Sequence, residues 1–234
     1  MADQATEATY IIDPEKRKEL EEKIGVTKGD NRPQIDFYVM SFCPYGNQAE
    51  EAIEPVYQLL KGKADFNPHY VVYANYAGVG PNYCIDAESK YCSMHGVHEM
   101  NQDLREHCVN KYMGTTKLFE FMLAMNSECN AQNADECWQG VAEELGLDSA
   151  KIASCQKNEG LTFAKEDSEL NSILGVQGSP TVFIDGEPYN GARDSAGYAQ
   201  ALCAAFDDAP AECDDLSAFG SETPTAADGA GCGV

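Results

Sequence analysis

Ten cysteines constrain this chain more than any other feature of its sequence. The chain has 234 residues, and its cysteines stand at positions 43, 84, 92, 108, 129, 137, 155, 203, 213 and 232. Reducing compartments seldom keep so many thiols unless the thiols bind metal. The count therefore favours an extracytoplasmic location (periplasmic, secreted or lumenal) and a fold braced by several disulfides.

The charge balance excludes two classes of partner. Sixteen Lys plus Arg face 39 Asp plus Glu, which gives a net charge of −23. Such a chain is repelled by the phosphates of nucleic acid and by anionic membrane surfaces. No apolar run approaches the roughly 20 residues of a spanning helix, so we expect no membrane insertion. Met1-Ala2-Asp3-Gln4 lacks a basic or apolar leader, and we expect the signal peptide to be absent from this chain.

The hydrophobic pattern predicts an α/β fold with an inserted helical block. Strands are predicted at 35–40, 69–73 and 181–184, and Asp185-Gly186 predicts a hairpin turn into 187–189. Helices are predicted at 49–60, kinked at Pro55, and at 195–206. Between about 80 and 160 the pattern is helical and rich in cysteine. Helices packed on a sheet, with an added helical layer, are the natural architecture.

Five segments follow from this order of elements. A polar segment, 1–34, holds a short helix that begins after Asp13 and ends near Gly25. Residues 35–79 and 163–213 are predicted to be the two halves of the α/β domain, and 80–162 the helical insertion. The last segment, 214–234, is rich in small residues from Ala218 onward and is predicted to be flexible.

Cys43 stands where a predicted strand ends and a helix begins. The free N–H groups and the dipole at a helix N-terminus stabilise an anion. This position therefore lowers the pKa of a thiol and makes it nucleophilic. Pro44, Tyr45 and Gly46 suit an exposed turn, so we expect an accessible thiol, although the alternative is a buried cysteine that only packs.

A second signal lies about 135 residues later. Gly178-Ser179-Pro180-Thr181 places a proline directly before a strand, after a Gly-Ser turn, where a cis peptide bond is a candidate.

Together these motifs resemble the thioredoxin superfamily, in the branch of the bacterial disulfide oxidoreductase DsbA with its helical insertion. The resemblance implies a DsbA-like thioredoxin fold over about 35–206, with Cys43-Pro44-Tyr45-Gly46 as the redox motif and Ser179-Pro180-Thr181 as the cis-proline loop. It implies that Cys43 and Pro180 are catalytic and that the substrate contacts Pro44, Tyr45, Gly46, Ser179 and Thr181. In related folds the residue before the cis-proline pairs with an extended substrate by strand addition.

A second, partial likeness begins at Cys92. The residues Cys92, His95-Gly96, Glu99, Asn101 and Cys108 are similar to the signature of gamma-interferon-inducible lysosomal thiol reductases. The match is partial because Met100 stands where that signature has a cysteine, and Asn101 arrives early.

The main departure is at the redox motif, where Gly46 replaces the second cysteine of the family's Cys-x-x-Cys. A mixed disulfide at Cys43 must then be resolved by an external thiol, such as glutathione, or by another cysteine of this chain. We hypothesise that Cys232, flanked by glycines on the tail, is that resolving thiol; the alternatives are a stray thiol or an intermolecular link. Loss of the second cysteine favours reduction or isomerisation over oxidation.

The other eight cysteines fit four structural bridges. Cys203–Cys213 and Cys84–Cys92 are plausible local pairs, whereas Cys108, Cys129, Cys137 and Cys155 allow three connectivities that the sequence leaves open. A zinc site among Cys92, His95, His98, His107 and Cys108 is the alternative, but its spacing matches no common zinc pattern. An iron–sulfur cluster is not favoured because the Cys-Gly-Phe-Ser motif is missing, so we expect no metal and no cofactor.

The sequence thus predicts a thiol–disulfide oxidoreductase that acts on thiols or disulfides of proteins. The alternative is a non-catalytic binding or scaffold protein that keeps the fold. The carboxylates Asp36, Glu50 and Glu51 are expected either to relay protons or, more simply, to be solvated.

Overall fold

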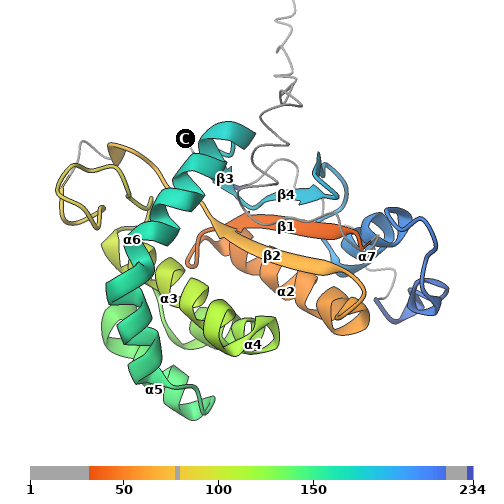
Figure 1. The fold of residues 1–234 in the computed structure, drawn as a ribbon, viewed down its shortest axis with the longest axis horizontal. Coiled ribbons are helices and arrows are strands. Elements are labelled where there is room, and N and C mark those ends of the chain that lie inside the picture. The colour runs from red at the N-terminus through yellow and green to blue at the C-terminus, as the bar shows by residue number, and fades with distance from the viewer. Residues whose placement is uncertain (1–31, 77–79, 220–230, 234) are drawn as a thin grey trace, which may run out of the picture.

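A four-stranded mixed sheet organises the residues described in the computed structural model, which are 32–76, 80–219 and 231–233 (Figure 1). The strand order is β2-β1-β4-β5. Strand β1 (Gln34–Val39) is parallel to β2 (Asp65–Tyr70) and antiparallel to β4 (Thr181–Ile184), and β5 (Glu187–Pro188) pairs with β4. The hairpin predicted at Asp185-Gly186 is confirmed, since both residues have positive φ, 48° and 78°.

The central strand β1 is buried on both faces. Ile35, Phe37 and Val39 pack with Ile53 and other residues of α2 (Pro44–Leu60) in the main core. The alternate residues Tyr38 and Met40 belong to a second cluster, which includes Leu170, Val176 and Phe183. Cys43, which follows the turn after β1, belongs to this second cluster.

Four helices follow β2 and form the helical block. They are α3 (Val97–Met113), α4 (Thr115–Glu128), α5 (Ala134–Glu144) and α6 (Ser149–Leu174). The boundary predicted between 162 and 163 falls inside α6, because this helix continues unbroken for 26 residues. It returns the chain to β3 (Gly178–Ser179) and β4, and α7 (Ser195–Ala204) then packs against α2. The short 3-10 helices η2 (Ala211–Cys213) and η3 (Ser217–Phe219) come next.

All ten cysteines are paired. The structure joins Cys84 to Cys92 and Cys203 to Cys213, the two local pairs expected from the sequence. It resolves the open choice as Cys108–Cys155, which links α3 to α6, and Cys129–Cys137, which closes the turn between α4 and α5. Each bridge constrains the unfolded chain, typically by about 2–4 kcal/mol.

The second strand was predicted in the wrong place. It spans 65–70 instead of 69–73, and Pro68 lies inside it. Proline cannot donate a ladder hydrogen bond, so the sequence disfavoured a strand here. Among the described strands, β2 pairs only with β1 and is an edge strand, where proline is tolerated. Beyond it, Tyr73 forms an antiparallel bridge with Cys92.

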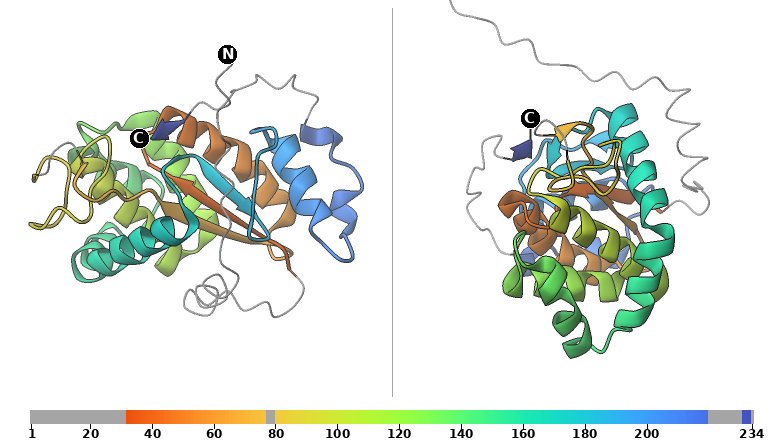
Figure 2. Two further views of the ribbon diagram at one scale, coloured as in Figure 1. Left: turned by 90° about the horizontal axis from the view of Figure 1, so that it is seen from above. Right: turned by 90° about the vertical axis from the view of Figure 1, so that its left-hand side faces the viewer.

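The tail is ordered at its last described residues. Cys232–Gly233 form strand β6, which pairs antiparallel with β3 and lies at the amino end of α2 (Figure 2). The predicted flexibility is therefore wrong for these residues, whereas most of the tail, and the helix predicted at 13–25, lie outside the described residues. None of the described helices has the length and apolar content needed to cross a bilayer.

Candidate active site

Cys43 is the N-cap of α2, directly after the turn that follows β1. Its backbone is extended (φ −78°, ψ 119°), and Pro44 is the first helical residue, as the sequence predicted. The N–H of Asn47 donates to the carbonyl of Cys43 at 2.9 Å, which closes the first helical turn. The residue is fully buried, however, so the expectation of an accessible thiol is wrong for this oxidised state.

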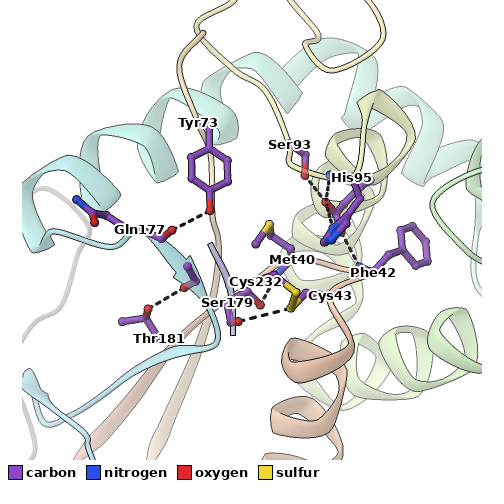
Figure 3. Close-up of a disulfide and its surroundings, with 12 residues drawn as sticks. Met40, Phe42, Cys43, Tyr73, Ser93, His95, Gln177, Ser179, Thr181 and Cys232 are labelled. Atoms are coloured by element: carbon purple, nitrogen blue, oxygen red, sulfur yellow. Dashed lines mark hydrogen bonds and ion pairs between the residues drawn. A yellow bond between two sulfur atoms is a disulfide. The ribbon is translucent and has the colours of Figure 1, made fainter. Parts of the chain in front are cut away.

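Cys232 covers Cys43 and is bonded to it. The two Cα atoms are 6.0 Å apart, and 189 positions separate the residues in sequence. In Figure 3, Cys232 and Ser179 lie together on one side of Cys43. The pairing of β6 with β3 places Cys232 opposite Ser179 and Gly233 opposite Gly178. The tail therefore contributes both a sulfur and a short strand to the site.

Ser179 fixes the geometry between β3 and β1. Its buried hydroxyl accepts a hydrogen bond from the N–H of Met40 at 3.0 Å, and its carbonyl oxygen lies 3.5 Å from the sulfur of Cys43. The peptide bond between Ser179 and Pro180 is cis. Thr181 donates its hydroxyl to the carbonyl of Gly178 at 2.7 Å, so it closes this loop.

The predicted substrate-contacting residues divide into two groups. Pro44 and Tyr45 are exposed beside Cys43, and Tyr45 is 37% exposed. Gly46, by contrast, is buried under Ser179 and offers no surface to a ligand. The structure therefore brings the two motifs together but leaves only part of each accessible.

Two carboxylates that sequence reasoning did not assign to the site hold the turn before Cys43. Glu99 accepts the N–H of Phe42 at 2.8 Å, and Asp103 accepts the N–H of Ser41 at 3.1 Å and its hydroxyl at 2.6 Å. Both residues lie on α3 and are fully buried. The signal that pointed to Glu99 was the partial likeness over His95-Gly96-x-x-Glu99.

The acids near this turn form a buried group. Glu50, expected to be solvated or to relay protons, is buried, whereas Glu51 is exposed. Asp36 on β1 is buried too, but away from this group, where it accepts hydrogen bonds from Gln34 and Asn67. Burial raises the pKa of Glu50 and of Asp103 well above the usual range, and nearby carboxylates add to both shifts. Burial also raises the pKa of Glu106 to about 7.

The residues of the alternative zinc site are not gathered in one place. Cys92 and Cys108 are in separate disulfides, with Cys84 and Cys155. The three histidines pair with three different acids: His95 with Glu99, His98 with Asp135, and His107 with Asp167. Within the described residues there is no cluster of three or more metal-ligating side chains.

No family model matches the chain. Two curated plant proteins are similar to it over part of their length. Vacuolar-sorting receptor 1 of Pisum sativum is 23% identical over 233 residues, covering 83% of this chain and 37% of the receptor. Vacuolar-sorting receptor 4 of Arabidopsis thaliana is 24% identical over 184 residues, covering 65% of this chain and 29% of the receptor. The chain thus spans about a third of the length of the curated relatives that it matches.

Solved structures show the fold. Oxidised BdbD of Bacillus subtilis superposes with a TM-score of 0.54 at 13% identity, covering 76% of this chain and 89% of that one. Reduced DsbA of Mycobacterium tuberculosis gives 0.53 at 17% identity, covering 80% and 90%. The disulfide bond oxidoreductase DsbG of the same organism gives 0.53 at 17% identity, covering 80% and 86%. The chain therefore has a DsbA-like thioredoxin fold with a helical block braced by disulfides.

Proposed function

We propose that this chain is a thiol–disulfide oxidoreductase in which Cys43 and Cys232 form the redox pair. The observation that carries the proposal is the disulfide between the N-cap of α2 and the tail strand β6. Cys232 supplies the second sulfur that the motif lacks at Gly46. The fold, which it shares with disulfide oxidoreductases, supports the same class of reaction.

The proposed cycle transfers two electrons. In the reduced protein the Cys43 thiolate attacks a substrate disulfide, forms a mixed disulfide and releases one substrate sulfur as a thiolate that takes up a proton. Cys232, deprotonated, then attacks the sulfur of Cys43 and expels the second substrate sulfur, which is protonated in turn. The products are a substrate dithiol and the Cys43–Cys232 disulfide. An external dithiol, or two thiols, returns the pair to the reduced state and becomes oxidised.

The packing around the disulfide supports reduction or isomerisation rather than oxidation of substrates. The oxidised state fixes β6 on β3, and Cys232 packs against the cluster that contains Tyr38, Met40 and Phe183. We propose that these contacts form only when the disulfide closes. They then stabilise the oxidised pair, which makes the reduced pair a better electron donor.

We propose proteins as the substrates and an oxidising compartment as the location. The five disulfides support this location, since structural bridges persist outside the reducing cytosol. Exposed Tyr45 and Pro44, beside the sulfur, are the surface that a protein substrate contacts first.

Insulin reduction with a limiting thiol donor tests the proposal. Cys43→Ser should reduce the rate to the uncatalysed background, because no nucleophile remains at the helix N-terminus. Cys232→Ser should slow turnover and accumulate a mixed disulfide at Cys43, detectable as a mass adduct. The matched control, Cys203→Ser with Cys213→Ser, removes a bridge between α7 and η2 and should keep the rate. Equal rates for wild type and Cys43→Ser would contradict the proposal.

A second candidate is a peptide-binding module without turnover. It is favoured by the similarity to vacuolar-sorting receptors and by the full burial of Cys43. In this role β3 presents its edge to an extended peptide once the tail leaves. Isothermal titration of the reduced chain with Cys-free extended peptides distinguishes the two: saturable binding without insulin reduction favours the module, and reduction without such binding favours the enzyme.

A further inference from the structure

Glu99 connects the turn before Cys43 to a separate loop. Its side chain is fully buried in the first turn of α3 and accepts hydrogen bonds from both sides. From one side comes the N–H of Phe42, at 2.8 Å. From the other come the hydroxyl of Ser93, the N–H of His95 at 3.2 Å, and the His95 ring, whose Nδ1 lies 2.8 and 2.9 Å from the two carboxylate oxygens.

Figure 3 shows this arrangement on the side of Cys43 away from Ser179 and Cys232, where Ser93 and His95 lie beside the backbone of Phe42. Phe42 is the residue directly before Cys43, so a charge on Glu99 lies close to the reactive sulfur. A buried carboxylate costs several kcal/mol unless it is hydrogen-bonded or paired. Among the described residues, His95 is the only basic side chain that contacts it.

The other ionisable groups around Glu99 do not supply a positive charge. They are Asp103 and Glu106 of α3, Glu50 of α2 and Tyr73 after β2. Burial raises the pKa of each of these carboxyls. Burial also raises the pKa of Tyr73 to about 12, and the nearby Tyr76 and Glu99 add to this shift. The protonated, uncharged forms of all four groups are therefore favoured. The balance of charge beside Cys43 therefore depends on Glu99 and His95.

His95 can exchange its proton with solvent. Its side chain is 27% exposed and lines a cavity of about 320 Å³ together with Phe42, Asn47 and Asn126. Its hydrogen bond with Glu99 raises the pKa of the imidazole above the usual value, against the opposing effect of burial.

We propose that Glu99 is a positioning residue for Cys43 and that protonated His95 neutralises Glu99, so that the neighbouring sulfur ionises without opposing a buried negative charge. Glu99 holds the Phe42 amide and thereby fixes the turn. His95 sets whether the pair is neutral or carries one negative charge. The inference rests on the proposed function only in taking Cys43 as the reacting sulfur.

The test is the alkylation rate of Cys43 in the full, reduced chain, followed by mass mapping of the Cys43 peptide with iodoacetamide as the probe. His95→Gln leaves the charge of Glu99 unbalanced, so the pKa of the Cys43 thiol should rise by about one unit, and alkylation at pH values below the wild-type thiol pKa should slow about tenfold. The double variant, His95→Gln with Glu99→Gln, removes both charges and should restore the rate to within about threefold of wild type. Glu143→Gln, at an exposed position of α5, is the control and should change nothing.

A merely structural role gives the opposite pattern, because losing both partners would disturb the turn more than losing one. A double variant as slow as His95→Gln, or a His95→Gln chain that alkylates like wild type, overturns the proposal. If the variants do not fold, the wild-type pH profile decides. An inflection from His95 in addition to that of the thiol supports the pair, and a single inflection overturns it. Since alkylation needs no turnover, a chain inactive on insulin can still give either result.

Discussion

Ser179 occupies the space that a side chain at Gly46 would require. A Cβ atom at Gly46 would lie 2.5 Å from the Ser179 hydroxyl oxygen and 3.2 Å from the Met40 carbonyl oxygen. The same hydroxyl accepts the N–H of Met40, so it is held in place. Packing across the site thus leaves no room for a side chain at position 46, and a cysteine introduced there would displace Ser179.

This contact predicts strong coupling between the two positions. Gly46→Ala should destabilise the fold by about 1–3 kcal/mol through overpacking, and Ser179→Ala by about 1–3 kcal/mol because the Met40 N–H loses its partner. In the Ser179→Ala background the Gly46→Ala substitution should cost at least about 1 kcal/mol less. Urea unfolding of the four proteins measures this coupling. Strictly additive losses would contradict the packing described for the two residues.

Substituting a glycine that flanks Cys232 should change the reduction potential of the Cys43–Cys232 pair. A Cβ atom at Gly233 would lie 2.8 Å from the Gln177 carbonyl oxygen, and one at Gly231 would lie 3.0 Å from the Ser179 carbonyl oxygen. Gly233→Ala should therefore weaken docking of β6 and make the Cys43–Cys232 pair easier to reduce, by about 20–40 mV.

Equilibration in glutathione buffers, followed by alkylation and mass mapping of both cysteines, measures the shift. Gly140→Ala is the matched control, since nothing lies within 4 Å of a Cβ atom there. A Gly233→Ala chain with the wild-type potential would argue against tight docking of the tail strand.

Glu106 predicts how stability depends on pH. Because burial raises its pKa from 4.5 to about 7, the folded state holds a proton that the unfolded state has lost between these values. The stability that this proton contributes is present at pH 4.5 and is lost as the pH rises through 7. Glu106→Gln removes this dependence. From pH 5 to pH 8, the wild type should lose more free energy of unfolding than the variant, as measured in urea. Parallel profiles would show that Glu106 titrates normally.

Two helical glycines predict different responses to alanine. Gly140, in α5, has open space around its Cβ position, so Gly140→Ala should raise stability by about 0.5–1 kcal/mol. Gly160, in α6, faces α3, and a Cβ atom there would lie 2.9 Å from Cδ1 of buried Leu104. Gly160→Ala should gain nothing, because Leu104 must change its rotamer. Thermal unfolding compares the two, and an equal gain at both sites would be inconsistent with close packing of α3 on α6.

Local sequence patterns were sufficient to predict the elements on either side of Cys43 and the hairpin after β4. The strand before Cys43, the helix that begins with Pro44 and the hairpin at Asp185-Gly186 each follow from their own residues. Strand β2 was misplaced, because Pro68 is acceptable only at a sheet edge, and the sequence does not reveal which strand is at the edge.

The buried acids could not be predicted for a different reason. Glu50 and Asp103 are acidic residues, which usually lie on the solvated surface. Their burial depends on partners distant in sequence, such as Asn126 for Glu50 and Ser41 for Asp103. The short strand at Cys232 was missed because two residues show no periodicity. It exists because β3 provides a partner and Cys43 a covalent bond.

The bond between Cys43 and Cys232 also turns most of the oxidised chain into a covalent ring. A protease that cuts the backbone once, anywhere between these two residues, opens the ring without dividing the molecule. At a cut that no other bridge spans, the two fragments separate on a non-reducing denaturing gel only in those molecules in which this bond is open. Nicking the chain in its exposed loops therefore gives a simple measure of how much of a sample holds this bond closed.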